Sequence, residues 1–263
     1  MPLVNLGDIT LNVVERGSGP VLLLVHGYPL DHQMWRHQLD GLAADYRVIA
    51  PDLRGFGQST VTPGVVTMQR FANDLAALLD ALKVREPITL CGLSMGGYIA
   101  WQFAQHHRQR LAKLVLCDTK AVADTAEGAK ARLESAQKVL AEGPQAIVDG
   151  MIAKLFAPQT PSQQPDLVKG QREIILGTKP EGIAAALRGM AEREDVSGRL
   201  GEFDLPTLVI CGEHDTIAPL EEMRSIAAEL PRATFAPIAE AGHMAPLEQP
   251  TAVNQALRTF LQS

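Results

Sequence analysis

The chain has 263 residues, of which 46% are hydrophobic, and its net charge is −6. This length is common for a single α/β domain, and the acidic balance argues against nucleic acid as a partner, because phosphates favour a basic surface. The sequence has no long apolar stretch and no basic segment near its start, so we expect neither a membrane span nor a signal peptide. Three cysteines do not indicate a disulfide framework, and we expect a cytoplasmic monomer or homodimer.

Apolar runs alternate with helical patterns along much of the chain. The opening stretches 3–6 and 9–14 alternate polar and apolar residues, which predicts an antiparallel hairpin at a sheet edge. Unbroken apolar runs predict buried parallel strands at 21–25, 47–50, 88–91, 114–117 and 207–211. Helical patterns follow at 33–44, 68–82, 96–107 and 219–229. This alternation predicts an α/β fold with a mostly parallel central sheet.

The alternation stops between Asp118 and Gly201, where only helical patterns occur. Prolines separate four expected helices, at 126–141, 145–156, 164–176 and 181–193. A structureless insertion of this length would be unusual, so we expect a helical cap at 119–201 inserted into a core of 1–118 and 202–263. Its apolar residues are candidates for the core of the cap or for a pocket lining: Leu133, Val139, Leu140, Ile147, Met151, Ile152, Leu155, Ile175, Leu187 and Met190.

The segment Gly92-Leu93-Ser94-Met95-Gly96 follows an apolar run and precedes a helical pattern. This is the G-x-S-x-G pattern of a nucleophile elbow, in which a tight turn lifts the serine hydroxyl clear of the sheet. Glycine fits the flanking positions because little room remains for a Cβ atom, and the free N–H groups of the following helix favour negative charge. A motif of this length also occurs by chance, and a glycine-rich turn packed for shape alone is the alternative.

Three other loops supply what a nucleophilic serine requires: a base, an acid that orients it, and donors for the oxyanion. Asp215 follows the expected strand 207–211, and His243 lies in a loop before the final helix. The chain order Ser94, Asp215, His243 is the order of the α/β-hydrolases. The turn 26–29 follows the first buried strand and could present a backbone N–H to the oxyanion. All these positions follow strand ends, where ligands bind in parallel sheets.

With these pieces, the chain resembles α/β-hydrolases of the esterase and 3-oxoadipate enol-lactonase type. The matching segments span nearly the whole chain: 26–29, 51–59, 92–96, the Asp215 loop and Gly242-His243. The resemblance implies that Ser94 is the nucleophile, His243 the base and Asp215 the orienting acid. It also implies that the backbone N–H groups of Tyr28 and Met95 form the oxyanion hole. The implied substrate is a small carboxylic ester or lactone, hydrolysed through an acyl-enzyme without metal or cofactor.

Several residue assignments have alternatives. Asp118 also ends a strand and is the other candidate for the orienting acid, although the glycine-led loop of Asp215 fits the family pattern better. We expect Trp35, Leu30 and Phe156 to line the substrate pocket, although Trp35 on a helix facing the sheet has an equally good explanation in core packing. His26 is expected to support the oxyanion turn. His32 and His37 lack partners at metal-ligand spacing, so no metal site is predicted.

The reaction itself has alternatives too. An enol-lactone hydrolase would bind a substrate with a free carboxylate, which calls for a cation in the pocket, and the candidates are Arg132, Arg172, Arg188 and Lys154. A carbon–carbon bond hydrolase would use the same triad, and a ligand-sensing module would keep the fold with slow turnover. Serine at the nucleophile position disfavours haloalkane dehalogenases and epoxide hydrolases, whose relatives use aspartate there.

Overall fold

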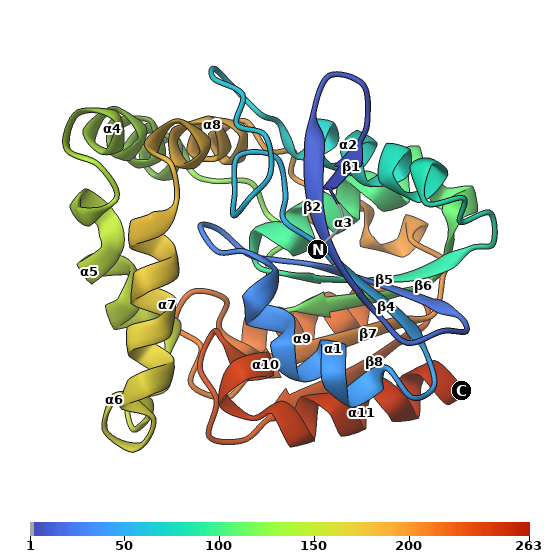
Figure 1. The fold of residues 1–263 in the computed structure, drawn as a ribbon. Helices are drawn as coiled ribbons and strands as arrows, with labels where there is room; N and C mark the ends of the chain where they lie inside the picture. The colour runs from blue at the N-terminus through green and yellow to red at the C-terminus, as the bar shows by residue number, and fades with distance from the viewer. Residues whose placement is uncertain (1–2) are drawn as a thin grey trace.

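An eight-stranded sheet forms the centre of the protein, in a computed structural model that describes residues 3–263 (Figure 1). The strand order is β1 (Leu3–Asn5), β2 (Thr10–Arg16), β4 (Arg47–Pro51), β3 (Val21–Val25), β5 (Ile88–Leu93), β6 (Leu111–Cys117), β7 (Thr207–Gly212) and β8 (Ala233–Ile238). Strand β2 is antiparallel to β1 and β4, and every other neighbouring pair is parallel. The predicted edge hairpin and the five predicted parallel strands are therefore confirmed.

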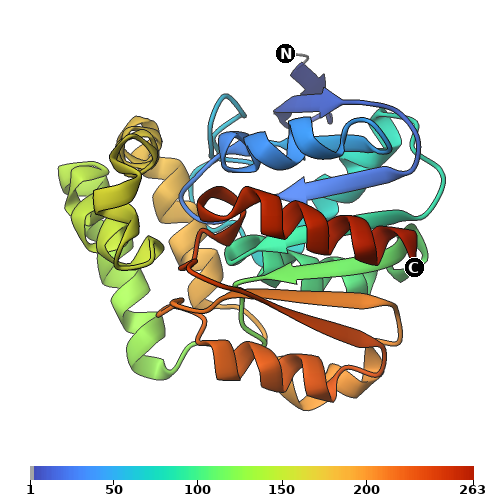
Figure 2. The same ribbon diagram turned by 90° about the horizontal axis from the view of Figure 1, so that it is seen from below.

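Helices cover both faces of the sheet, which explains why its central strands are unbroken apolar runs. One apolar layer joins the sheet to α2 (Met68–Ala81), α3 (Met95–His106) and α9 (Leu220–Glu229). The layer on the other face joins it to α1 (Arg36–Leu42) and α11 (Pro250–Gln262), which Figure 2 shows side by side. Short helices complete the core: η1 (His32–Trp35), η2 (Arg108–Arg110), η3 (Ser197–Glu202) and α10 (Ala245–Glu248).

Five α-helices occupy the chain between β6 and β7, ahead of the short η3. They are α4 (Ala126–Glu142), α5 (Gln145–Leu155), α6 (Thr160–Gln163), α7 (Pro165–Gly177) and α8 (Pro180–Ala191). Figures 1 and 2 both show this α4–α8 segment gathered beside one end of the sheet, where α4 packs against α8 and α5 against α7. The four predicted helices are confirmed, and the short α6 was not predicted. Among residues 3–263, no helix has the length and apolar character that crossing a membrane requires.

Candidate active site

Ser94 lies in the turn between β5 and α3 with φ 54° and ψ −115°. A serine rarely adopts a positive φ, and such strain persists only where the surroundings hold it. Here the Ser94 N–H donates to the Cys117 carbonyl at 3.0 Å, and the Thr119 hydroxyl donates to the Ser94 carbonyl at 2.7 Å. Strand β6 and the residue pair that follows it therefore fix the backbone of the elbow.

The glycines around Ser94 are required by close backbone contacts. A Cβ atom on Gly92 would lie 2.2 Å from the Gly96 carbonyl oxygen, and one on Gly96 would lie 2.3 Å from the Val25 carbonyl oxygen. Both distances are far below van der Waals contact. The lack of room expected from the motif is therefore confirmed, and larger residues would force β5, α3 and β3 apart.

His243 and Asp215 form a buried pair at the carboxyl ends of the strands. The Asp215 Oδ2 atom lies 2.7 Å from His243 Nδ1, and both side chains are almost fully buried. The other carboxylate oxygen of Asp215 accepts the backbone N–H groups of Ile217 at 2.7 Å and Ala218 at 3.0 Å. Since Nδ1 faces a carboxylate oxygen that accepts, Nδ1 carries a proton, and the neutral tautomer with this arrangement has Nε2 as its acceptor.

Ser94 and His243 line the same cavity, which has a volume of about 250 Å³. The remaining lining residues are Tyr28, Tyr98, Ala131, Arg132, Ser135, Ile147, Met151, Leu155, Leu187, Met190 and Ile217. Residues 3–263 contain no hydrogen bond between the Ser94 hydroxyl and His243, a contact that is often long in ligand-free sites. Of the apolar candidates in the α4–α8 segment, five reach the cavity: Ile147, Met151, Leu155, Leu187 and Met190.

Two backbone N–H groups at this site lack an acceptor. Within the described part of the chain, neither Tyr28 nor Met95 donates its backbone N–H to another protein atom. Met95 is the first residue of α3 and follows Ser94, and Tyr28 lines the cavity. Free donors beside the Ser94 hydroxyl are what oxyanion stabilisation would require if Ser94 acted as a nucleophile.

His26 supports the turn that carries Tyr28, as expected. Its Nε2 accepts the Leu53 N–H at 2.9 Å, and its Nδ1 lies 2.9 Å from the Gly27 carbonyl oxygen. Burial lowers the pKa of His26, which keeps the imidazole neutral. The ring therefore links the β3 and β4 loops and has no free nitrogen for proton transfer.

Three predicted pocket residues lie elsewhere, and the structure corrects their assignment. Trp35, Leu30 and Phe156 are absent from the cavity lining and are buried in the apolar layer shared with α11. Trp35 belongs to η1, which precedes α1 in the predicted helix 33–44. Its side chain is fully buried within the apolar layer. Phe156 follows the end of α5, where the preceding residue, Leu155, faces the cavity instead.

Asp118, the alternative acid, is close to Asp215 but makes no hydrogen bond to His243. One Asp118 oxygen accepts the Gly212 N–H at 2.8 Å, and the other is buried without a partner in the described residues. Burial and the neighbouring Asp215 carboxylate raise the pKa of Asp118 well above its usual range. The geometry therefore favours Asp215 as the partner of the imidazole, with Asp118 as a neutral neighbour.

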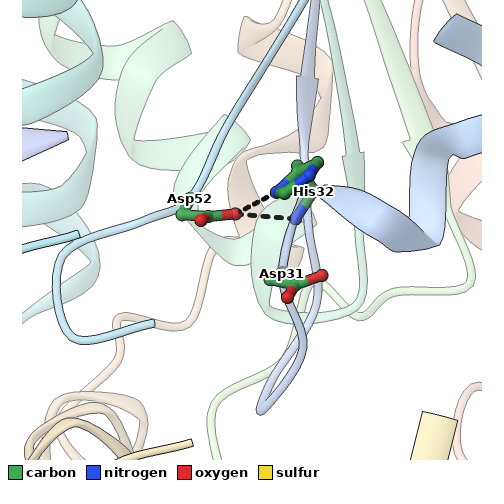
Figure 3. Close-up of side chains that lie close together, drawn as sticks. All are labelled: Asp31, His32 and Asp52. Atoms are coloured by element: carbon green, nitrogen blue, oxygen red, sulfur yellow. Dashed lines mark hydrogen bonds and ion pairs between the residues drawn. The ribbon is translucent and has the colours of Figure 1, made fainter. Parts of the chain in front are cut away.

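The structure also brings together a cluster that sequence spacing did not reveal. One side-chain oxygen of Asp31, one of Asp52 and one ring nitrogen of His32 lie within 4.8 Å of one another (Figure 3). Asp52 accepts both the backbone N–H and Nδ1 of His32, at 2.9 and 2.6 Å, and its other oxygen accepts from Asn12 and Gln58. Burial disfavours the charged forms of both side chains, yet the hydrogen bonds outweigh it, holding the pKa of Asp52 at about 2 and raising the pKa of His32. The cluster thus joins the β3 and β4 loops through hydrogen bonds that occupy both Asp52 oxygens.

One cation reaches the cavity, and its role was left open by the sequence. Arg132 lines it from α4, with its guanidinium bonded to Asp124 and with Nη1 3.6 Å from the Met190 sulfur. The other cationic candidates lie outside the lining: Arg172 pairs with Asp149, Arg188 donates to the Gly64 carbonyl, and Lys154 is exposed. Tyr98, in the elbow helix, also lines the cavity and was not singled out by its sequence pattern.

Comparison with known proteins agrees with this geometry. A family model described as alpha/beta hydrolase fold matches residues 20–250. The chain belongs to the α/β-hydrolase fold family. It is 28% identical over 257 residues to 3-oxoadipate enol-lactonase 2 of Acinetobacter baylyi, covering 97% of this chain and 94% of that protein.

Solved structures of α/β-hydrolases superpose closely on this chain. A thermophilic esterase from Thermogutta terrifontis with malate bound superposes with a TM-score of 0.95 at 46% identity, covering 97% of this chain and 93% of that one. The enol-lactonase from Burkholderia xenovorans gives a TM-score of 0.92 at 26% identity over the full length of both chains. The family and the fold expected from the sequence are therefore confirmed.

Proposed function

We propose that the protein hydrolyses small carboxylic esters through an acyl-enzyme on Ser94. The observation that carries this proposal is the shared cavity of Ser94 and His243, with Asp215 bonded to the far side of the imidazole. A serine, an imidazole whose Nδ1 is held by an acceptor, and a buried carboxylate constitute the groups that acyl transfer requires. The similarity to an esterase and to enol-lactonases supports the same reaction class.

The proposed mechanism follows from the positions of these groups. His243 Nε2 takes the proton of Ser94 as the hydroxyl oxygen attacks the ester carbonyl, and Asp215 stabilises the imidazolium that forms. The backbone N–H groups of Tyr28 and Met95 bind the oxyanion. The protonated His243 then gives its proton to the leaving alcohol. Water repeats the sequence on the acyl-enzyme, releasing the acid and restoring Ser94.

The α4–α8 segment acts in this proposal as the cap of the site, with residues 119–201 inserted between core segments 1–118 and 202–263. Support comes from the cavity, to which this segment contributes eight lining residues: Ala131, Arg132, Ser135, Ile147, Met151, Leu155, Leu187 and Met190. A cap built this way shields the site from bulk solvent, while single water molecules still reach the acyl-enzyme, and it shapes the acyl pocket. The expectations of a monomer or homodimer and of a cytoplasmic location stay predictions.

The decisive experiment is hydrolysis of p-nitrophenyl acetate at multiple turnovers by the wild type and by Ser94→Ala. We expect the variant to lose nearly all turnover while it keeps the wild-type melting temperature. Ser225→Ala is the matched control, because that serine is exposed and its hydroxyl bonds only to the Glu221 carbonyl of its own helix. Wild-type turnover in Ser94→Ala would refute the proposal, and a single turnover in the wild type would indicate a ligand-sensing module.

A second candidate, hydrolysis of esters or lactones that carry a free carboxylate, is favoured by Arg132. Its cation lines a largely apolar cavity, and the buried Tyr28 hydroxyl beside the same cavity has no partner within residues 3–263. Burial raises the pKa of Tyr28, so the hydroxyl stays a donor. A carboxylate could therefore accept from both groups.

The test of this second candidate compares p-nitrophenyl hydrogen succinate with p-nitrophenyl butyrate, which has similar length and no charge. We expect Arg132→Leu to lower kcat/KM for the succinate about tenfold or more, as for a lost charge-assisted hydrogen bond, and to leave the butyrate nearly unchanged. Equal losses on both substrates would indicate a packing role for Arg132.

A further inference from the structure

Glu248 is a buried carboxylate outside the proposed triad, five residues after His243 at the end of α10. Its exposed fraction is 3%, and the elements around it are the His243 loop and the junction between α5 and α6. Carboxylates are seldom buried so completely without a specific partner. In the sequence, Glu248 stands five residues after His243 and two before Pro250, a spacing that does not mark it as functional.

The two oxygens of Glu248 accept hydrogen bonds from opposite sides. Oε1 accepts the backbone N–H of Gly242, the residue before His243, at 2.8 Å. Oε2 accepts the backbone N–H of Ala157 at 2.8 Å and the hydroxyl of Thr160 at 2.5 Å, both in the α4–α8 segment. One side chain therefore joins the histidine loop to that segment through charge-assisted hydrogen bonds, which are the stronger kind.

The surrounding contacts leave the loop little freedom. A Cβ atom on Gly242 would lie 2.4 Å from the Ala157 backbone nitrogen, so the two backbones are already in close contact. The Met244 N–H, on the other side of His243, donates to the Leu155 carbonyl at 3.1 Å. Leu155 lines the cavity, whereas Thr160 does not. A shift of the α5–α6 junction is therefore transmitted to both neighbours of His243.

We propose that Glu248 is a positioning residue that sets the place of His243 by tying its loop to the α5–α6 junction. This inference rests on the proposed function for its kinetic readout. Glu248 touches neither Ser94 nor the cavity, and it acts only through Gly242 and the loop. Glu248 thereby controls the orientation of the imidazole relative to the serine hydroxyl. This orientation matters because a small misplacement of a base slows the chemical step.

The primary variant is Thr160→Val, which keeps the side-chain shape and removes one donor to Glu248. We expect kcat for p-nitrophenyl acetate to fall about tenfold or more with KM unchanged, because misplacement of a catalytic group by about 1 Å can cost roughly 10²-fold. Thr160→Ser restores the hydroxyl and should restore kcat. Ser162→Ala is the matched control, since Ser162 lies two residues from Thr160 and its hydroxyl bonds only to the Gln159 carbonyl. Glu248→Gln should show the larger loss if it folds.

A second measurement separates positioning from stability and from the proposed function. The proton that His243 Nδ1 shares with Asp215 gives a downfield ¹H NMR resonance, whose shift reports the geometry of that bond without any substrate. We expect Thr160→Val to move or broaden this resonance and Ser162→Ala to leave it in place. Unchanged kcat and an unchanged resonance in Thr160→Val would overturn the role of Glu248, and so would a rise in KM alone. Failure of the wild type to hydrolyse esters would overturn the proposed function, while the resonance would still test Glu248.

Discussion

Replacing Asp215 with asparagine tests the centre of the proposed mechanism, and the structure fixes how the amide must lie. One oxygen of Asp215 accepts the backbone N–H groups of Ile217 and Ala218, and the other faces His243 Nδ1. An asparagine keeps its single oxygen on the two N–H groups. Its NH₂ group then points at Nδ1, which must become an acceptor, so the proton moves to Nε2 and His243 can no longer receive the proton of Ser94.

The size of the expected loss in kcat follows from the free-energy cost of turning the asparagine amide the other way. Turning the amide would leave two backbone N–H groups without an acceptor at about 1–3 kcal/mol each, or about 2–6 kcal/mol together. The productive orientation would then be populated in about one molecule in thirty at most, and in far fewer at the upper limit. The serine-protease triad loses roughly 10⁴-fold in kcat on the same substitution, through the same tautomer effect. We expect Asp215→Asn to lose about 10³- to 10⁴-fold in kcat, or about 4–5.5 kcal/mol.

The assay is steady-state hydrolysis of p-nitrophenyl acetate, with KM and the melting temperature measured on the same preparations. Asp118→Asn is the matched control, because burial and the Asp215 charge already keep the Asp118 carboxyl protonated. An amide there replaces a neutral group, and we expect kcat within about threefold of the wild type. Loss of activity in Asp118→Asn together with retained activity in Asp215→Asn would refute the role proposed for Asp215.

Two further predictions concern stability. His32→Asn keeps a donor to Asp52 but removes the titratable ring. The pKa of His32 is raised in the folded protein, so the contribution of its charge to the free energy of unfolding is complete below about pH 6.5. That contribution is lost as the pH rises through the pKa of the folded state. Denaturant unfolding should therefore show a larger loss in His32→Asn at pH 5 than at pH 8, with Asp52 ionised at both, and an equal loss would contradict the charged pair. Leu24→Ala, at a fully buried position of β3, should lower the free energy of unfolding by about 2–5 kcal/mol. Leu133→Ala, at a leucine 45% exposed on α4, should cost far less, and comparable losses at the two sites would show that burial does not control the effect.

The local pattern of the sequence determined the fold and most of the proposed machinery. Buried parallel strands are unbroken apolar runs because helices cover both faces, so β3 to β7 could be identified without coordinates. The elbow at Ser94 is equally local, since a tight strand-to-helix turn admits only glycine at its closest contacts. The end of a strand then marked Asp215, because ligands gather at the carboxyl ends of a parallel sheet.

Only the tertiary structure decided which side chains meet. The cavity lining depends on how the α4–α8 segment packs on the core, so Arg132 and Tyr98 line it while Trp35, Leu30 and Phe156 do not. A helical pattern gives the apolar face of a helix but not the partner of that face, which is why core and pocket residues could not be separated. Glu248 and the Asp31–His32–Asp52 cluster depend in the same way on contacts between loops distant in sequence. The contact that favours Asp215 over Asp118 as the orienting acid, the bond to His243, likewise spans 28 residues of sequence.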